Sequence, residues 1–148
     1  MGKAQLLTVP QIYKFMMTYD LAALAPANTL FNFGIYVNGN NGSPVNPAVV
    51  PSNEKWYILN FEVSSAVTPD FLFGLIVNGT NQGVNLDANT TVPTNGARVE
   101  LSSAVNGYAD SIEVPPSANI QVTGYTLTAN GTSAVVYTAF MKVLRVPL

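Results

Sequence analysis

The stretch FNFGIYVNGN, from Phe31 to Asn40, is written again forty positions later as FLFGLIVNGT, from Phe71 to Thr80. In the first stretch apolar residues occupy every second position from Phe31 to Val37, which is the pattern of a β-strand with one buried face. Both stretches end at an Asn-Gly step, which tolerates positive φ and turns the chain tightly. The chain contains six such steps, so few helices are expected; they begin at Asn38, Asn41, Asn78, Asn95, Asn106 and Asn130.

The similarity extends in front of both stretches. With one gap, KFMMTYDLAALAPANTLFNFGIYVNG (Lys14 to Gly39) aligns with KWYILNFEVSSAVTPDFLFGLIVNG (Lys55 to Gly79), and EVPPSANIQVTGYTLTANG (Glu113 to Gly131) is a looser third copy. Each copy is interpreted as a strand, a turn and a strand. We expect similar hairpins that each present one apolar face to a shared core, because turn and alternation signals explain nearly every matched position. The rival interpretation is that each copy carries a binding site, but turn and alternation signals give no specific support for a binding site.

The whole chain shows short strand patterns separated by Pro, Gly and Asn. The predicted strands are Ile12–Leu21, Thr29–Val37, Lys55–Ser64, Phe71–Val77, Arg98–Ser102, Ser111–Val114, Ile120–Thr128 and Ser133–Val146. Eight strands at this spacing predict an all-β protein, a single eight-stranded jelly-roll β-sandwich. A short helix after Pro10 is the rival for the first strand. Long loops are expected at Gly39–Asn53 and Gly79–Ala97, at the ends of the sandwich.

Residues 21–148 are expected to form the sandwich domain, and residues 1–20 an N-terminal arm or an edge strand. The arm is apolar and carries adjacent methionines, whose flexible side chains suit irregular surfaces. We expect it to pack on a neighbouring copy of the chain. The candidate interface residues are Ile12, Tyr13, Phe15, Met16 and Met17.

Charge is the most unusual feature of the composition. Charged residues make up 9% of the 148-residue chain, against about 25% in typical soluble domains. The six basic residues are scattered, so no surface that tracks phosphates is expected and nucleic acid is set aside as a main partner. The N-terminal residues have no apolar run of signal-peptide length, and the uncharged stretch 21–53 holds too many Pro, Gly and Asn residues for a membrane helix. We therefore expect synthesis without a cleaved leader.

The sequence offers few groups for chemistry. It contains neither Cys nor His, which excludes disulfides, zinc sites built on these residues and His-based catalysis. The carboxylates Asp110 and Glu113 lie close in sequence, but solvation of strand ends explains them better than acid–base catalysis. NLDANTT, from Asn85 to Thr91, has oxygen ligands at alternate positions but lacks the Gly and the closing Glu of a calcium loop. We expect no enzyme activity, no metal and no cofactor, and a small-molecule ligand is not favoured.

Three further sets of residues are assigned to the surface or to the core. Asn-x-Ser/Thr sequons in the predicted loops make Asn41 and Asn89 candidate glycosylation sites, should the protein meet a glycosylating compartment. The residues expected in the core are Phe15, Trp56, Phe71, Phe73 and Phe140. The tyrosines that could face a partner or a sugar are Tyr36, Tyr108 and Tyr125.

The segment IEVPPSANIQVTGYTLTANGTSAVVYTAFMKVLRV, from Ile112 to Val146, resembles the single jelly-roll proteins of viral capsids. In that family a strand leads through a Pro-x-x-Asn-Ile turn into two long strands that close the sandwich. The low charge and the lack of Cys and His look like virion proteins of archaeal viruses from hot, acidic water. The resemblance implies a subunit of a shell, vertex or spike in the virion, with copies of itself and other capsid proteins as partners and no catalytic residues.

Low charge favours assembly independently of the resemblance. Few charges give weak repulsion between copies and few edge residues that prevent association, which suits a protein packed among its own copies. The alternative is a secreted or cell-surface β-sandwich that binds carbohydrate or forms filaments by strand addition.

Overall fold

The computed structural model describes residues 7–39, 42–63, 69, 71–88, 98–100 and 111–148. Over these residues the chain forms eleven β-strands and no helix, which confirms the all-β class and the strand alternative for the segment after Pro10. The strands are β1 (Gln11–Leu21), β2 (Leu30–Asn32), β3 (Gly34–Tyr36), β4 (Ala48–Val49), β5 (Glu54–Val63), β6 (Phe71–Val77), β7 (Thr80–Ala88), β8 (Arg98–Glu100), β9 (Ile112–Val114), β10 (Asn119–Thr126) and β11 (Val135–Pro147).

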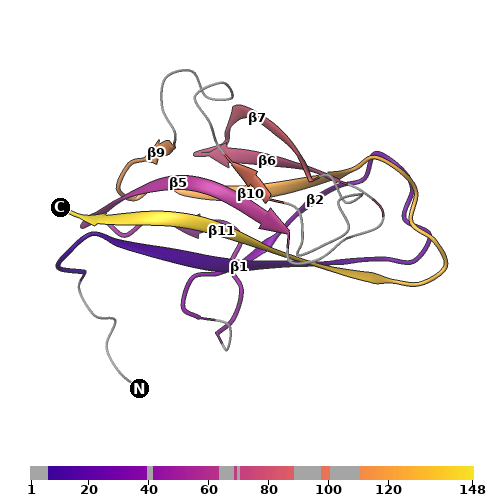
Figure 1. The fold of residues 1–148 in the computed structure, drawn as a ribbon, viewed down its shortest axis with the longest axis horizontal. Coiled ribbons are helices and arrows are strands. Elements are labelled where there is room, and N and C mark those ends of the chain that lie inside the picture. The colour runs from indigo at the N-terminus through magenta and orange to yellow at the C-terminus, as the bar shows by residue number, and fades with distance from the viewer. Residues whose placement is uncertain (1–6, 40–41, 64–68, 70, 89–97, 101–110) are drawn as a thin grey trace.

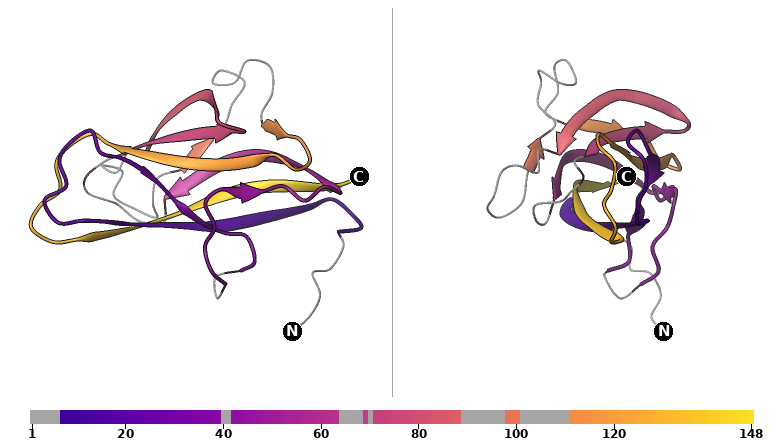
Figure 2. Two further views of the ribbon diagram at one scale, coloured as in Figure 1. Left: turned by 180° about the vertical axis from the view of Figure 1, so that it is seen from behind. Right: turned by 90° about the vertical axis from the view of Figure 1, so that its right-hand side faces the viewer.

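The strands form two antiparallel sheets that pack face to face (Figure 1). The six-stranded sheet has the order β3-β1-β11-β5-β8, with β9 also paired to β5. The five-stranded sheet has the order β2-β10-β6-β7, with β4 also paired to β10. Seen along the long axis, the two sheets curve around a common interior (Figure 2). This arrangement confirms the predicted β-sandwich.

The strand pairs are nested within the sequence. β1 pairs with β11, β2 with β10, β5 with β8 and β9, and β6 with β7. In these four sets the first strand of the chain meets the last, and strands further in from each end meet one another; β3 is an exception, since it pairs with β1. The pair β1·β11 is the longest, with eleven residues of β1 in register from Gln11↔Arg145 to Leu21↔Val135.

β1 leads to β2, β5 to β6, and β9 to β10, and each step crosses from the six-stranded to the five-stranded sheet. The expectation of hairpins is therefore wrong for the second and third copies. In the first copy β3, which follows β2, returns to pair antiparallel with β1. The shared core is confirmed. Apolar alternation specifies which face of a strand is buried, but it does not specify the strand's hydrogen-bonding partner. Two successive strands show the same alternation whether they pair within one sheet or face each other across the core.

The two repeated stretches differ in how they bend. The second forms β6 and turns into β7 through Asn78 and Gly79, whose φ angles of 49° and 78° fit the two-residue turn expected for Asn-Gly. The first splits into β2 and β3, which lie in different sheets. Its change of sheet falls at Phe33 and Gly34, where Phe33 donates to Val122 in the five-stranded sheet.

The predicted count of eight strands does not match the eleven of the structure. β7 (Thr80–Ala88) occupies the first half of the predicted loop Gly79–Ala97, and β4 lies inside the predicted loop Gly39–Asn53. TNQGVNLDA, the sequence of β7, has the Asn, Asp and Gly content typical of loops. The Asn78-Gly79 turn places it beside β6, so pairing with an apolar neighbour overrides its own propensity.

Aromatic rings fill the centre of the core. Phe31 and Phe33 from the first stretch meet Phe71 and Phe73 from the second, with ring centroids 4.9 to 5.9 Å apart. Tyr137 of β11 stacks on this group and donates a buried hydrogen bond of 2.6 Å to the carbonyl of Pro69. The repeated phrase thus supplies matched aromatic residues to one cluster.

Four of the five predicted core aromatics are buried, namely Phe15, Trp56, Phe71 and Phe73. The prediction for Phe140 is wrong. In β11 the buried positions begin at Tyr137 and continue through Ala139 and Met141, so Phe140 faces outward. There the ammonium of Lys14 lies 5.3 Å from the centre of its ring.

Candidate functional site

The charged side chains of the six-stranded sheet form ion pairs with one another. Lys14 of β1 reaches across β11 to Glu62 of β5, with Nζ 2.6 Å from Oε2. Lys55 of β5 lies 2.8 Å from Glu113 of β9. Within the described ranges no group of three or more His, Cys, Asp or Glu side chains is placed to hold a metal ion. Asp110 and the residues from Asn89 to Thr91 of the calcium-like stretch lie outside the described residues.

A third ion pair, Glu54 with Arg145, closes one end of the core. The guanidinium donates two hydrogen bonds of 2.7 Å, one to each oxygen of the buried carboxylate. The indole of Trp56 donates a third, of 2.9 Å, to Oε1. The Arg145 guanidinium also lies 4.5 Å from the centre of the Tyr13 ring. This arrangement seals the apolar interior where β5 begins and β11 ends.

The Arg145 hydrogen bonds hold the pKa of the Glu54 carboxyl below its usual value, and they outweigh the burial that would raise it. The same hydrogen bonds raise the pKa of the Arg145 guanidinium. Both groups therefore stay ionised at neutral pH. A carboxylate that accepts three hydrogen bonds in this way stabilises the fold and is a poor proton donor or acceptor for catalysis.

The five predicted interface residues all lie on β1, but they face different ways. Phe15 and Met17 are buried in the core, and Tyr13 is half-buried beneath Arg145. Ile12 is 58% exposed, and Met16 lies on the same outer face. Residues 11–21 pair with β11 over their whole length, and residues 1–6 lie outside the described residues. The part of β1 that is open to a neighbour is therefore the row that contains Ile12 and Met16.

This row continues on β11 to form what we call the outer stripe, the side chains of β1 and β11 that face away from the core. Its members are Ile12, Lys14, Met16, Thr18, Asp20, Val136, Thr138, Phe140, Lys142 and Leu144. Five of these ten are apolar, and Lys14 is engaged by Glu62. Ile12 and Val136, at opposite ends, are 58% and 62% exposed. The stripe is therefore long and half apolar, and of its three charged side chains, Lys14, Asp20 and Lys142, Lys14 is held in an ion pair.

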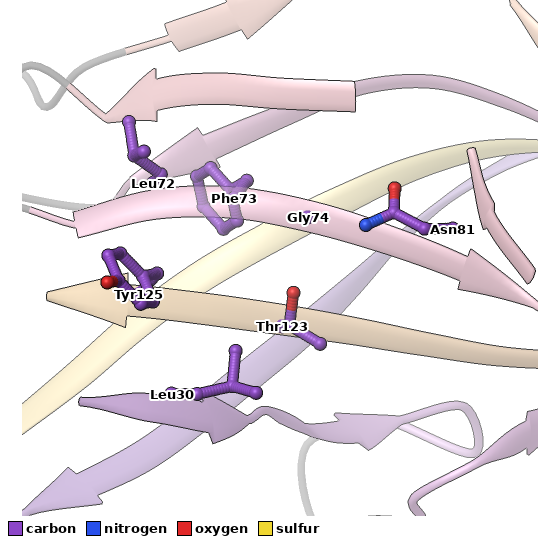
Figure 3. Close-up of a pocket in the computed structure, with 7 residues that line it drawn as sticks. All are labelled: Leu30, Leu72, Phe73, Gly74, Asn81, Thr123 and Tyr125. Carbon is purple, nitrogen blue, oxygen red and sulfur yellow. The ribbon is translucent and has the colours of Figure 1, made fainter. Parts of the chain in front are cut away.

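A hollow of about 330 Å³ lies on the outer face of the five-stranded sheet. Its lining comes from four strands and consists of Leu30, Leu72, Phe73, Gly74, Asn81, Thr123 and Tyr125 (Figure 3). β6 alternates between buried and half-buried residues, and Gly74 lies in the half-buried, outward row. Gly74 contributes no side chain to the lining of the hollow.

Of the three tyrosines expected at the surface, Tyr125 is 37% exposed and forms a wall of the hollow. Tyr36 of β3 is half-buried. Tyr108 and both candidate glycosylation sites, Asn41 and Asn89, lie outside the described residues.

Apart from Tyr125, the residues that line the hollow were not assigned to a binding surface from the sequence, and Phe73 was predicted only as a core residue. Thr123, Gly74 and Asn81 lie far apart in the chain and become neighbours because β6 lies between β10 and β7. The one signal present was the glycine shared by the FNFG and FLFG stretches, at Gly34 and Gly74. In an otherwise bulky strand, such a glycine marks a close approach or an opening.

No protein-family model matches the chain, and the search of curated proteins gave no match. Among the described residues no helix is long and apolar enough to cross a membrane. The function is therefore inferred from the fold, the surface and the chemistry of the residues described in this section.

Proposed function

We propose that the protein is a structural subunit of a virus particle, built on a jelly-roll fold and acting by packing against copies of itself and other capsid proteins. The observation that carries the proposal is the nested pairing of β1 with β11, β2 with β10, β5 with β8 and β9, and β6 with β7. Winding one long antiparallel hairpin into two facing sheets produces this pairing. Jelly rolls of this kind are used by many viral capsid proteins.

A fold hosts many functions, so the surface must add to the argument. Charged residues are 9% of the chain, and three ion pairs on the six-stranded sheet engage Lys14 with Glu62, Lys55 with Glu113 and Arg145 with Glu54. A surface with few free charges repels its copies weakly and loses little solvation when it is covered. These properties suit a subunit that is surrounded by neighbours in a shell, vertex or spike.

The outer stripe is the surface that we assign to contact between subunits. It is an outer sheet face with exposed apolar residues at both ends, Ile12 and Val136, and half-buried Met16 and Phe140 between them. A stable interface covers about 800 Å² on each partner, which is a tenth of the 8000 Å² surface of the chain. The outer stripe runs along the whole β1·β11 pair, which has eleven residues of β1 in register.

We expect Val136→Asp to weaken self-association by about tenfold or more, because contact at the stripe would then bury an unpaired carboxylate. Val136 is 62% exposed, so the substitution leaves the core intact. Sedimentation velocity over a concentration series measures the effect.

The matched control is Val49→Asp, at a valine that is 55% exposed on β4 of the other sheet. This variant should associate like the wild-type protein. Equal sedimentation of the Val136→Asp, Val49→Asp and wild-type proteins at every concentration would contradict the assignment of the stripe.

A further inference from the structure

The hollow over Gly74 lies on the sheet opposite the outer stripe, so the proposed assembly surface does not explain it. Its volume of about 330 Å³ is at the small end of the range of about 300–1,000 Å³ that ligand sites occupy. A cavity of this size accommodates a single six-membered ring with its substituents. The size therefore indicates a small ligand.

The lining selects for a neutral ligand. None of the seven lining residues is charged. An ion that entered the hollow would lose water without gaining a counter-charge, which is costly. Leu30, Leu72 and the ring of Tyr125 provide apolar walls, whereas Thr123 and Asn81 provide a hydroxyl and an amide. The ligand that fits these walls has both an apolar face and hydroxyl groups.

Thr123 is the lining residue that favours a hydroxylated ligand over a purely apolar one. It is 8% exposed, and within the described part of the chain its hydroxyl takes part in no hydrogen bond. The hydroxyl points toward β6 at Gly74, beneath the open face (Figure 3). Among the described residues Asn60 Oδ1 is the one buried polar side-chain atom without a hydrogen-bond partner, so the Thr123 hydroxyl is not sealed from solvent. Facing the hollow, it can both donate a hydrogen bond to a bound hydroxyl and accept one from it.

We propose that the hollow binds a neutral pyranose sugar. The C–H face of the sugar packs on the Tyr125 ring, and a sugar hydroxyl exchanges hydrogen bonds with Thr123 Oγ1. This site is independent of the assembly function, since it uses the other sheet and holds whether or not the subunits associate through the stripe.

The first test is an NMR titration of the isotopically labelled protein with the methyl glycosides of glucose, mannose and galactose. We expect amide shifts at Thr123, Tyr125 and Gly74 that saturate with at least one glycoside, at a Kd of about 1 mM or somewhat weaker because the site is open. Absence of shifts at these residues up to the solubility limit of all three glycosides would overturn the proposal. It would also be overturned if an extended apolar peptide shifted the same amides and the glycosides did not.

Two variants locate the site on the protein. Gly74→Val places a side chain in the hollow and should abolish binding, whereas Thr123→Val keeps the shape, removes the hydroxyl and should weaken binding about tenfold. Gln121→Ala, on the same face of β10 but outside the hollow, is the control and should bind normally. Should Gly74→Val fail to fold, the near-isosteric Thr123→Val still decides the matter. Wild-type affinity in Thr123→Val would contradict the assignment.

Discussion

Gly124→Ala is expected to destabilise the protein by about 3 kcal/mol or more, because the new methyl group has no space. A Cβ at this position would lie 2.1 Å from Cζ of Phe31 and 2.3 Å from its Cε2. The ring cannot move aside easily, since Tyr19 stacks on it at 4.2 Å and Tyr137 at 5.6 Å. β10 pairs with β2 and β6 at Gly124, so its backbone is held on both sides. Denaturant unfolding of the variant and the wild-type protein measures the loss.

The chain offers a matched control for this substitution. At Gly131 a Cβ would meet no atom within 4 Å, so Gly131→Ala should change the free energy of unfolding by less than about 0.5 kcal/mol. Shortening the ring in the double variant Gly124→Ala/Phe31→Leu should cost less than the sum of the two single changes, because the residues are in contact. A Gly124→Ala protein as stable as Gly131→Ala would refute the proposed packing.

The second large effect concerns the ion pair at the end of the core. Arg145→Met is expected to cost about 3–5 kcal/mol at neutral pH, because it leaves the buried Glu54 carboxylate without its counter-charge. In the wild-type protein that carboxylate is 3% exposed and receives both guanidinium hydrogen bonds. The double variant Glu54→Gln/Arg145→Met removes both charges and should recover part of the loss. Thermal unfolding at pH 7 gives both values.

The same pair predicts a response to acid. The pKa of Glu54 is lower in the folded chain than in the unfolded one. The stabilisation by the ion pair is therefore complete at pH values above the pKa of an ordinary carboxyl group, which is about 4. As the pH falls from there through the lower, folded-state pKa, the unfolded chain binds the proton first and this stabilisation is lost. Glu54→Gln should be less stable than the wild-type protein at pH 7, and its Tm should change less on acidification. Parallel Tm curves for the two proteins between pH 2 and pH 7 would show that Glu54 does not contribute in this way.

Four of the five aromatic residues that were predicted in the core are buried, and Phe140 is the exception. Along β1 the row with Phe15 and Met17 is inside and the row with Ile12 and Met16 is outside, whereas all four were named from the sequence as candidate interface residues. The pairing of strands could not be predicted in the same way. A chain that crosses to the opposite sheet and one that turns back on its neighbour have the same apolar period, so the three copies gave no sign of their crossings.

The failures at β7 and Phe140 have separate physical causes. β7 was missed because its own residues favour a loop, and its position depends on the turn at Asn78 and Gly79 and on pairing with β6. Phe140 was assigned to the core for its size, but it falls in the outward row of β11, one residue out of step with the buried Ala139 and Met141. On this outer face the ammonium of Lys14 lies 5.3 Å from the centre of the Phe140 ring, and the ring adds to the apolar character of the outer stripe.

The hollow could not be predicted because its lining comes from four strands. Its floor at Gly74 and its polar group at Thr123 come from strands separated in sequence and joined by the register Thr123↔Gly74. That register depends on the whole winding of the chain. Short sequence patterns therefore predict the fold class and much of the core. Predicting a site that is assembled from several strands requires knowledge of the topology.

Assembly is the central claim of this account, and the mass of the protein in solution tests it most directly. Light scattering should be measured on the wild-type protein over a concentration series at neutral and at low pH. We expect defined oligomers or large closed particles, as closed symmetric packing of subunits requires; a pentamer would place the subunit at a vertex. A monomer of 15.7 kDa that persists at high concentration under both conditions would contradict the claim.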